Sequence, residues 1–175
     1  MKKISNILIH PSAALTIRPK QVKGYRFTEK QPKLGDVIYG EVLRLGQHSS
    51  LENVSGRIHI IHNGSKGLFV FGNRYAPAYF EGFVPNRLMQ HVDLLARSGL
   101  VGEVRTKNTL IKDPTRVKVL GYAFDGDGNI LNTRDHSLVK PRVTIKNPKR
   151  AKLVLVVGTA MNSGKSMAAS ACCWA

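Results

Sequence analysis

The chain is organised around one stretch, which reads Leu153-Val-Leu-Val-Val-Gly158-Thr-Ala-Met-Asn-Ser-Gly164-Lys165-Ser166. Its first five residues are apolar and mostly β-branched, which predicts a strand buried on both faces. The two glycines let the following backbone turn tightly, so that successive N–H groups point at one anion. Residues 167–174 predict a helix, whose N-terminus also favours an anion. The stretch therefore predicts a phosphate-binding loop between a strand and a helix.

Two side chains in this loop have the chemistry that a nucleotide requires. Lys165 would supply a point charge for the β and γ phosphates, and Ser166 would supply a hydroxyl ligand for Mg²⁺. Five residues separate Gly158 from Gly164, one more than in the strict Gly-x4-Gly-Lys-Ser/Thr (Walker A) pattern. The alternative is a buried strand and an ordinary glycine turn that bind nothing. The joint match of strand, loop and helix favours the phosphate loop.

The segment from Gly158 to Ser170 resembles the phosphate loop of dethiobiotin synthetase and of the related cobyrinic and cobyric acid synthases. These P-loop NTPases share the longer spacing and the Gly-Thr start, although Ala160 stands where the family usually carries an acidic residue. Because the family's loop holds the triphosphate of ATP, the resemblance implies ATP (or GTP) and Mg²⁺ as cofactors. It implies nucleotide contacts from Gly158, Thr159, Asn162, Ser163, Gly164, Lys165 and Ser166.

The resemblance covers only residues 153–175, the start of a P-loop domain. Such a domain needs further strands and a later acidic residue that holds Mg²⁺ and positions water. We therefore expect an N-terminal part of a longer, ATP-dependent protein of the ligase or synthetase type, which is not catalytically complete as this chain. The strand at 153–157 is expected to pack on the rest of the chain, to pair with a second copy in a homodimer, or to stay mobile.

The charge balance favours anionic partners. The chain has 27 Lys and Arg against 11 Asp and Glu, a net charge of +16. Such a field attracts nucleic acid, nucleotide phosphates or an anionic partner domain. A fragment parted from an acidic remainder would show the same excess, so both interpretations stay open.

The sequence indicates a cytoplasmic protein without a membrane span. Its longest apolar runs fall far short of the roughly 18 residues that a spanning helix needs. The apolar run near the N-terminus is short and is interrupted by Ser5 and Asn6. Cys172 and Cys173 are adjacent in the predicted helix and cannot easily bridge, which is cysteine usage typical of a reducing compartment.

Residues 1–34 form a basic lead-in segment. Between residues 10 and 35 there are three prolines, and Glu29 is the single acid. The segment is interpreted either as a solvated arm or as a contact for the phosphates of nucleic acid. Nucleic-acid binding by a basic β-barrel module is the alternative function, and it would depend on Lys20, Lys23 and Arg26.

Residues 35–138 predict a β-rich domain of short strands separated by turn clusters. This spacing is typical of a small antiparallel barrel or sandwich. The fold class is therefore a mainly β N-terminal domain, followed by the first β-loop-α unit of an α/β P-loop domain. The expected strands lie at 36–45, 56–61, 67–71, 92–96, 99–104 and 115–124.

Two loops of this domain allow more than one interpretation. Residues 72–85 combine aromatics with glycines, prolines and an arginine, so this loop either packs over one end of a barrel or stacks a base. Residues 125–129 start like a calcium loop, but the later ligands are missing, which leaves a hairpin turn. The histidines show no metal-ligand spacing. Residues 139–152 are basic and proline-containing, which predicts a linker or a domain boundary, and their position just before the loop also allows a place close to bound nucleotide.

Overall fold

The computed structural model describes residues 2–4, 9–136, 138 and 152–174, and it is mainly β, as predicted. The predicted linker at 139–152 lies outside the described residues apart from Lys152. The elements in chain order are η1 (Ser12–Ala14), η2 (Pro19–Gln21), β1 (Gly24–Arg26), β2 (Val37–Arg44), β3 (Ser50–Glu52), β4 (Ile58–Ile60), β5 (Lys66–Phe71), β6 (Arg74–Tyr75), β7 (Phe80–Phe83), β8 (His91–Leu94), β9 (Leu100–Lys107), β10 (Thr115–Phe124), η3 (Thr133–Asp135) and α1 (Lys165–Trp174).

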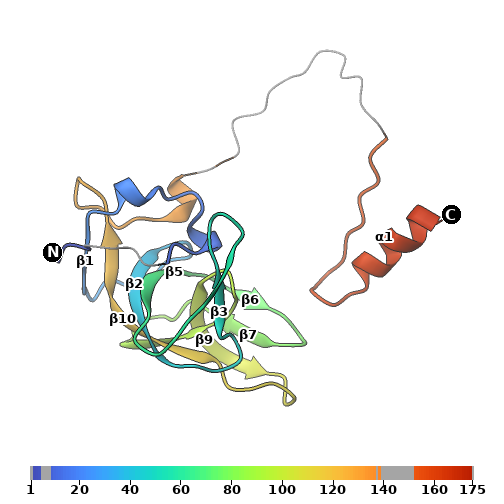
Figure 1. The fold of residues 1–175 in the computed structure, drawn as a ribbon, viewed down its shortest axis with the longest axis horizontal. Coiled ribbons are helices and arrows are strands. Elements are labelled where there is room, and N and C mark those ends of the chain that lie inside the picture. The colour runs from blue at the N-terminus through green and yellow to red at the C-terminus, as the bar shows by residue number, and fades with distance from the viewer. Residues whose placement is uncertain (1, 5–8, 137, 139–151, 175) are drawn as a thin grey trace, which may run out of the picture.

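Five strands follow one another in a closed series of backbone pairings (Figure 1). β2 pairs antiparallel with β5 and β10, and β8 pairs antiparallel with β10 and β9. A parallel pairing of β5 with β9 completes the series. Each of these strands therefore has a hydrogen-bonded neighbour on both sides. We call β2, β5, β9, β8 and β10 the strand ring.

Side chains alternate between the two faces of each strand in the ring, and this alternation produces two apolar layers. Ile38 and Phe69 are opposite each other in the β2–β5 register and belong to one buried cluster. Their neighbours Val37 and Leu68 belong to a second cluster, because successive side chains of a strand point to opposite faces. The first cluster draws on all five strands of the ring, with Phe71, Val101 and Tyr122 among its fully buried members.

The N-terminal segment covers the outer face of β2 and β5. Ala14 and Ile17 are fully buried and pack in the second cluster, together with Val22. β1 pairs with the end of β10, and the blue N-terminal ribbon runs along the ring (Figure 1). The prediction of a solvated arm is therefore wrong for this segment, because its apolar side chains fill a layer that β2 and β5 would otherwise expose to water.

A glycine fixes the junction between β1 and β10. Gly121 has φ +154°, and a Cβ there would meet the backbone carbonyl of Arg26 and lie 2.6 Å from the nitrogen of Phe27. The β2–β10 register shifts between Val119 and Gly121, so a bulge lies at the same place. A larger residue at position 121 would push β1 away from β10.

Two smaller hairpins extend the domain. β3 and β4 pair with each other, and β6 and β7 pair with each other and attach to β9 through β7. The predicted loop at 72–85 therefore contains two strands. Within it Ala76 and Phe80 are buried, as the packing interpretation expects, whereas Tyr75 is 60% exposed.

The six predicted strands of the β-rich domain all occur, as β2, β4, β5, β8, β9 and β10. β1, β3, β6 and β7 were not predicted. The turn at 125–129 is confirmed, since Phe124 bridges Ile130 and the Asp125 carboxylate accepts hydrogen bonds from the backbone of Asp127 and Asn129. In the described part of the chain, no helix has the length and apolar character needed to cross a membrane.

Candidate phosphate-binding site

The apolar run before the loop differs from its prediction. Residues 153–157 form no strand, and they pair with no other described segment. The exposed fractions are 79% for Leu153, 80% for Val154, 85% for Leu155 and 72% for Val157. The predicted buried strand is therefore wrong for this structure. A strand gains its stability from a hydrogen-bonded neighbour and from covered faces, and the described residues supply neither to this run.

The loop itself has the backbone of a tight turn that runs into a helix. Asn162 has φ +63°, the left-handed conformation that Asn tolerates better than most residues, and Gly164 has φ +81°. α1 begins at Lys165, directly after this turn, and the amide of Ala168 donates to the carbonyl of Gly164 at 3.0 Å. The amides of the first helical turn therefore open onto the loop.

Lys165 folds back over the loop. Its Nζ donates to the carbonyl oxygen of Ala160 at 2.6 Å and to Ser163 Oγ at 3.1 Å. Both acceptors are neutral, so these two bonds hold the ammonium in place without cancelling its charge. The first turn of α1 contains no acidic residue, which leaves the positive end of the helix uncompensated as well.

A glycine makes room for this arrangement. A Cβ at Gly158 would collide with Ser163 Oγ and would lie 3.0 Å from Lys165 Cγ. The two ends of the loop thus touch only because position 158 has no side chain. This packing gives Gly158 a steric role that requires no contact with a ligand.

A pocket of 490 Å³ lies on the loop and the start of α1. Five of the seven residues predicted to contact nucleotide line it, and Gly158 and Thr159 lie just before it. The residues that the sequence did not single out are Met161 and Met167. The lining residues are Met161, Asn162, Ser163, Gly164, Lys165, Ser166 and Met167.

The side chains of residues 158–166 offer a metal ion hydroxyl and amide oxygens but no carboxylate, and Ser166 supplies the hydroxyl predicted for Mg²⁺. Among the described residues, no group of three or more His, Cys, Asp or Glu side chains is placed to hold a metal ion. One hydroxyl suits a Mg²⁺ ion that is already coordinated by a nucleotide's phosphates and by water, because Mg²⁺ usually keeps several waters. The loop therefore fits Mg²⁺ only as a companion of the nucleotide.

A second polar cluster lies inside the β-rich domain and was not predicted. His48 Nε2 lies 3.1 Å from the carbonyl oxygen of Leu95, and Arg74 donates to the same oxygen. The His48 ring stacks on Tyr79 at 5.7 Å and meets the edge of Phe80 at 5.8 Å. Burial, followed by the nearby charge of Arg74, lowers the pKa of His48. These contacts make His48 a neutral packing residue.

Known proteins give no independent guide to this site. No protein-family model matches the chain, and neither the curated proteins nor the solved structures include a match. The functional argument therefore depends on the residues and their geometry.

Proposed function

We propose that residues 158–166 bind the phosphate groups of a nucleotide, ATP or GTP, together with its Mg²⁺. The observation that carries the proposal is the Lys165 ammonium, held over a turn at the positive end of α1 by two neutral oxygens. An anion that enters the pocket would meet the ammonium and the helix amides together.

Five of the seven predicted residues then have a role in binding. The amides of Asn162, Ser163 and Gly164 surround the phosphates, as expected of a turn with left-handed residues. Lys165 exchanges its bond to the Ala160 carbonyl for one to a phosphate oxygen, because a charged acceptor binds an ammonium more strongly than a neutral one. Ser166 completes the coordination of the Mg²⁺ that the nucleotide brings.

The apolar run at 153–157 sets a condition on this binding. If the resemblance to dethiobiotin synthetase extends to the fold, this run would lie inside a parallel sheet and would fix the position of the loop. We expect the loop to bind nucleotide more tightly when a neighbouring strand covers the run, because the loop is then preorganised. The same resemblance supports ATP-dependent ligase or synthetase chemistry for the protein that contains this loop.

Titration calorimetry with MgATP and with MgGTP tests the proposal. Lys165→Ala should weaken nucleotide binding roughly 10- to 150-fold, since a hydrogen bond to a charged group contributes about 1.5–3 kcal/mol. Lys152→Ala is the matched control, because Lys152 carries the same charge, is exposed and precedes the loop. Equal affinities of the wild type and Lys165→Ala would contradict the proposal, as would the absence of binding by the wild type.

We also infer that the strand ring is a small closed barrel. The closed series of pairings supports this, as does the buried cluster that draws on all five of its strands. Hydrogen exchange tests the inference at the β5–β9 pairing, where the amides of Val70 and Gly72 donate to β9 and its preceding turn. These amides should exchange as slowly as those of β2. Fast exchange there would indicate an open sheet.

A further inference from the structure

The N-terminal segment carries an unusual row of cations on the surface of the β-rich domain. Residues 18–33 contain six Lys and Arg side chains and one acid, Glu29. All six cationic residues are exposed, and none of them forms an ion pair among the described residues. We call this row the basic stripe, and it consists of Arg18, Lys20, Lys23, Arg26, Lys30 and Lys33.

The backbone of the basic stripe is fixed along its length. The amide of Lys23 donates to the carbonyl of Phe124 at 2.8 Å, and Tyr25 exchanges two hydrogen bonds with Lys2. Farther along, the buried Tyr122 hydroxyl donates to the carbonyl of Lys30 at 2.7 Å. The cations therefore project from a rigid support, so that binding a partner would order little more than their side chains.

Two acids near the stripe form no ion pair with it. The Asp125 carboxylate is occupied by the backbone of its own turn. Asp36 accepts from the amide of Lys33 and from the side chain of Asn132. Both carboxylates keep their negative charge, because these donors are neutral, but neither forms an ion pair with the stripe. The six cations of the stripe outnumber these two acids and Glu29 together.

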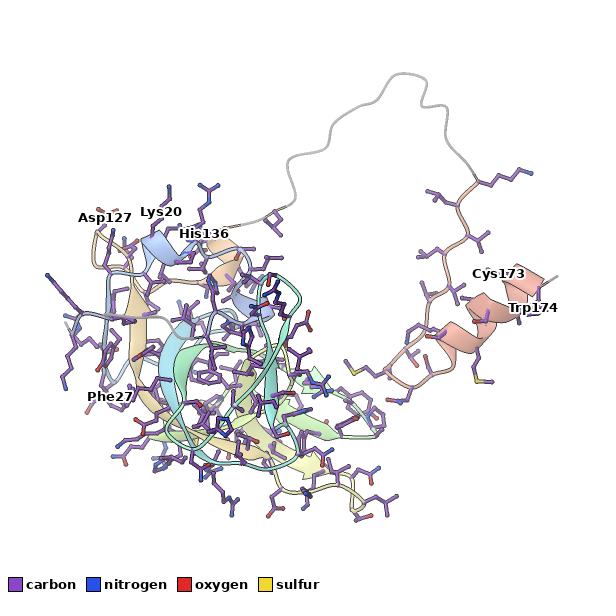
Figure 2. The ribbon with its side chains drawn as sticks, in the orientation of Figure 1. Lys20, Phe27, Asp127, His136, Cys173 and Trp174 are labelled. Atoms are coloured by element: carbon purple, nitrogen blue, oxygen red, sulfur yellow. The ribbon has the colours of Figure 1, made fainter. Side chains whose placement is uncertain are left out.

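An exposed aromatic ring lies within the stripe. Phe27 is 48% exposed and follows Arg26, whose guanidinium lies 4.9 Å from the centre of the Phe124 ring. Figure 2 labels Lys20 at the top of the β-rich domain and Phe27 at its lower left, so the stripe spans much of the domain in this view. Cations that alternate with an accessible ring match an anionic polymer that also presents flat bases.

We propose that the basic stripe binds single-stranded nucleic acid, with the cations on the phosphates and Phe27 stacked on a base. A duplex would leave Phe27 without a base to stack on, because its bases are already stacked. An anionic membrane would also draw on apolar side chains that insert, here Leu15, Phe27 and Leu34, which lie far apart in the sequence, so the vesicle measurement below decides between the two partners. This site is separate from residues 158–166 and does not depend on the nucleotide proposal.

Fluorescence anisotropy with labelled 20-nucleotide oligo(dT) and oligo(U) tests the proposal. We expect binding that weakens steeply with salt. The triple variant Lys20→Gln, Lys23→Gln, Arg26→Gln should bind about 100-fold more weakly at 0.1 M salt, since each phosphate contact on a single strand contributes a factor of ~5 at that concentration. Its salt slope should fall by about 2.

A matched control separates the stripe from the net charge. The variant Arg57→Gln, Lys112→Gln, Lys118→Gln removes the same three charges from exposed residues outside the stripe. It should bind nearly as well as the wild type, and equal losses in both variants would overturn the proposal. Far-ultraviolet circular dichroism checks that both variants fold. If the triple variant of the stripe does not fold, the single substitution Lys20→Gln replaces it, with an expected ~5-fold loss of affinity.

Two further measurements identify the partner. Phe27→Ala should weaken oligonucleotide binding roughly 5- to 150-fold, while Phe27→Tyr should preserve it, because stacking of one base contributes about 1–3 kcal/mol. Sedimentation with phosphatidylserine vesicles supplies the other comparison. Binding to the vesicles without binding to either oligonucleotide would overturn the proposal in favour of a membrane surface. Equal affinity for a duplex and a single strand would also overturn it.

Discussion

Two apolar, β-branched runs of this chain differ in their burial. β2 begins Val-Ile-Tyr and is buried from residue 37 to residue 40, while the run at 153–157 reads Leu-Val-Leu-Val-Val and is largely exposed. β2 has β5 and β10 as neighbours, and the N-terminal segment covers its outer face. The run at 153–157 has no strand neighbour among the described residues. The comparison teaches that burial of such a run is decided by its partners and not by its own residues.

The largest expected effect concerns the β-rich domain, where the apolar strands have neighbours. Phe69 on β5 is buried against the inner cluster, so Phe69→Ala should destabilise the β-rich domain by about 3–5 kcal/mol through lost burial and a residual cavity. Urea unfolding followed by circular dichroism measures this change. A loss below about 1 kcal/mol would mean that the inner cluster is loosely packed.

A smaller effect concerns the polar cluster inside the same domain. Because burial lowers the pKa of His48, the unfolded chain binds this proton more readily than the folded chain does. Stability should therefore be complete above about pH 6.5 and fall as the pH drops below that value, by at most about 1.4 kcal/mol per pH unit. Below the lowered folded-state pKa this loss should level off.

The urea concentration at the unfolding midpoint, measured between pH 7.5 and pH 5, reports the contribution of His48 to stability. This pH range lies above the one in which most carboxylates titrate. His48→Gln should reduce the slope, and His62→Gln, at an exposed residue, is the matched control for the loss of an imidazole. Identical slopes in all three proteins would show that His48 does not titrate differently on folding.

The smallest expected effect concerns the exposed run at 153–157. Leu155 is 85% exposed, so Leu155→Ala should change the unfolding free energy by less than about 0.5 kcal/mol. The same urea experiment measures it beside Phe69→Ala. A loss of about 2 kcal/mol or more would show that a neighbour covers the run in solution and would remove the contrast with β2.

The sequence was most informative where local pattern and partners agree. β2, β5 and β10 are rich in apolar, β-branched or aromatic residues, and each was predicted within a residue or two. β1 and β6 contain only three and two residues, and they are strands because β10 and β7 lie beside them. Nothing local marks such short strands. The solvated-arm prediction was wrong for a related reason, since Ile17 is buried by strands that follow it by twenty residues or more.

The candidate site was predictable because its residues lie next to one another in the sequence. The residues that line the loop pocket are consecutive, so the motif alone brings them together. The folded-back position of Lys165 was not predictable. Its acceptor is the backbone carbonyl of Ala160, and because every residue has such a carbonyl, the residue type does not reveal the bond. The mistaken strand before the loop has a different cause: the residue pattern was suitable, but no neighbour lies beside it.

The closed series of pairings has a consequence for biosynthesis. β2 requires β10, which begins 78 residues after Val37, so the ring cannot close until that strand has left the ribosome. At about 5–20 residues per second, synthesis of the intervening chain takes roughly 4–16 s. Once β5 has also emerged, β2 can pair with it but keeps an open edge of apolar residues until β10 arrives. The nascent domain is therefore a natural client for chaperones that shield unpaired strands, and slowing translation between β5 and β10 would prolong its exposure to aggregation.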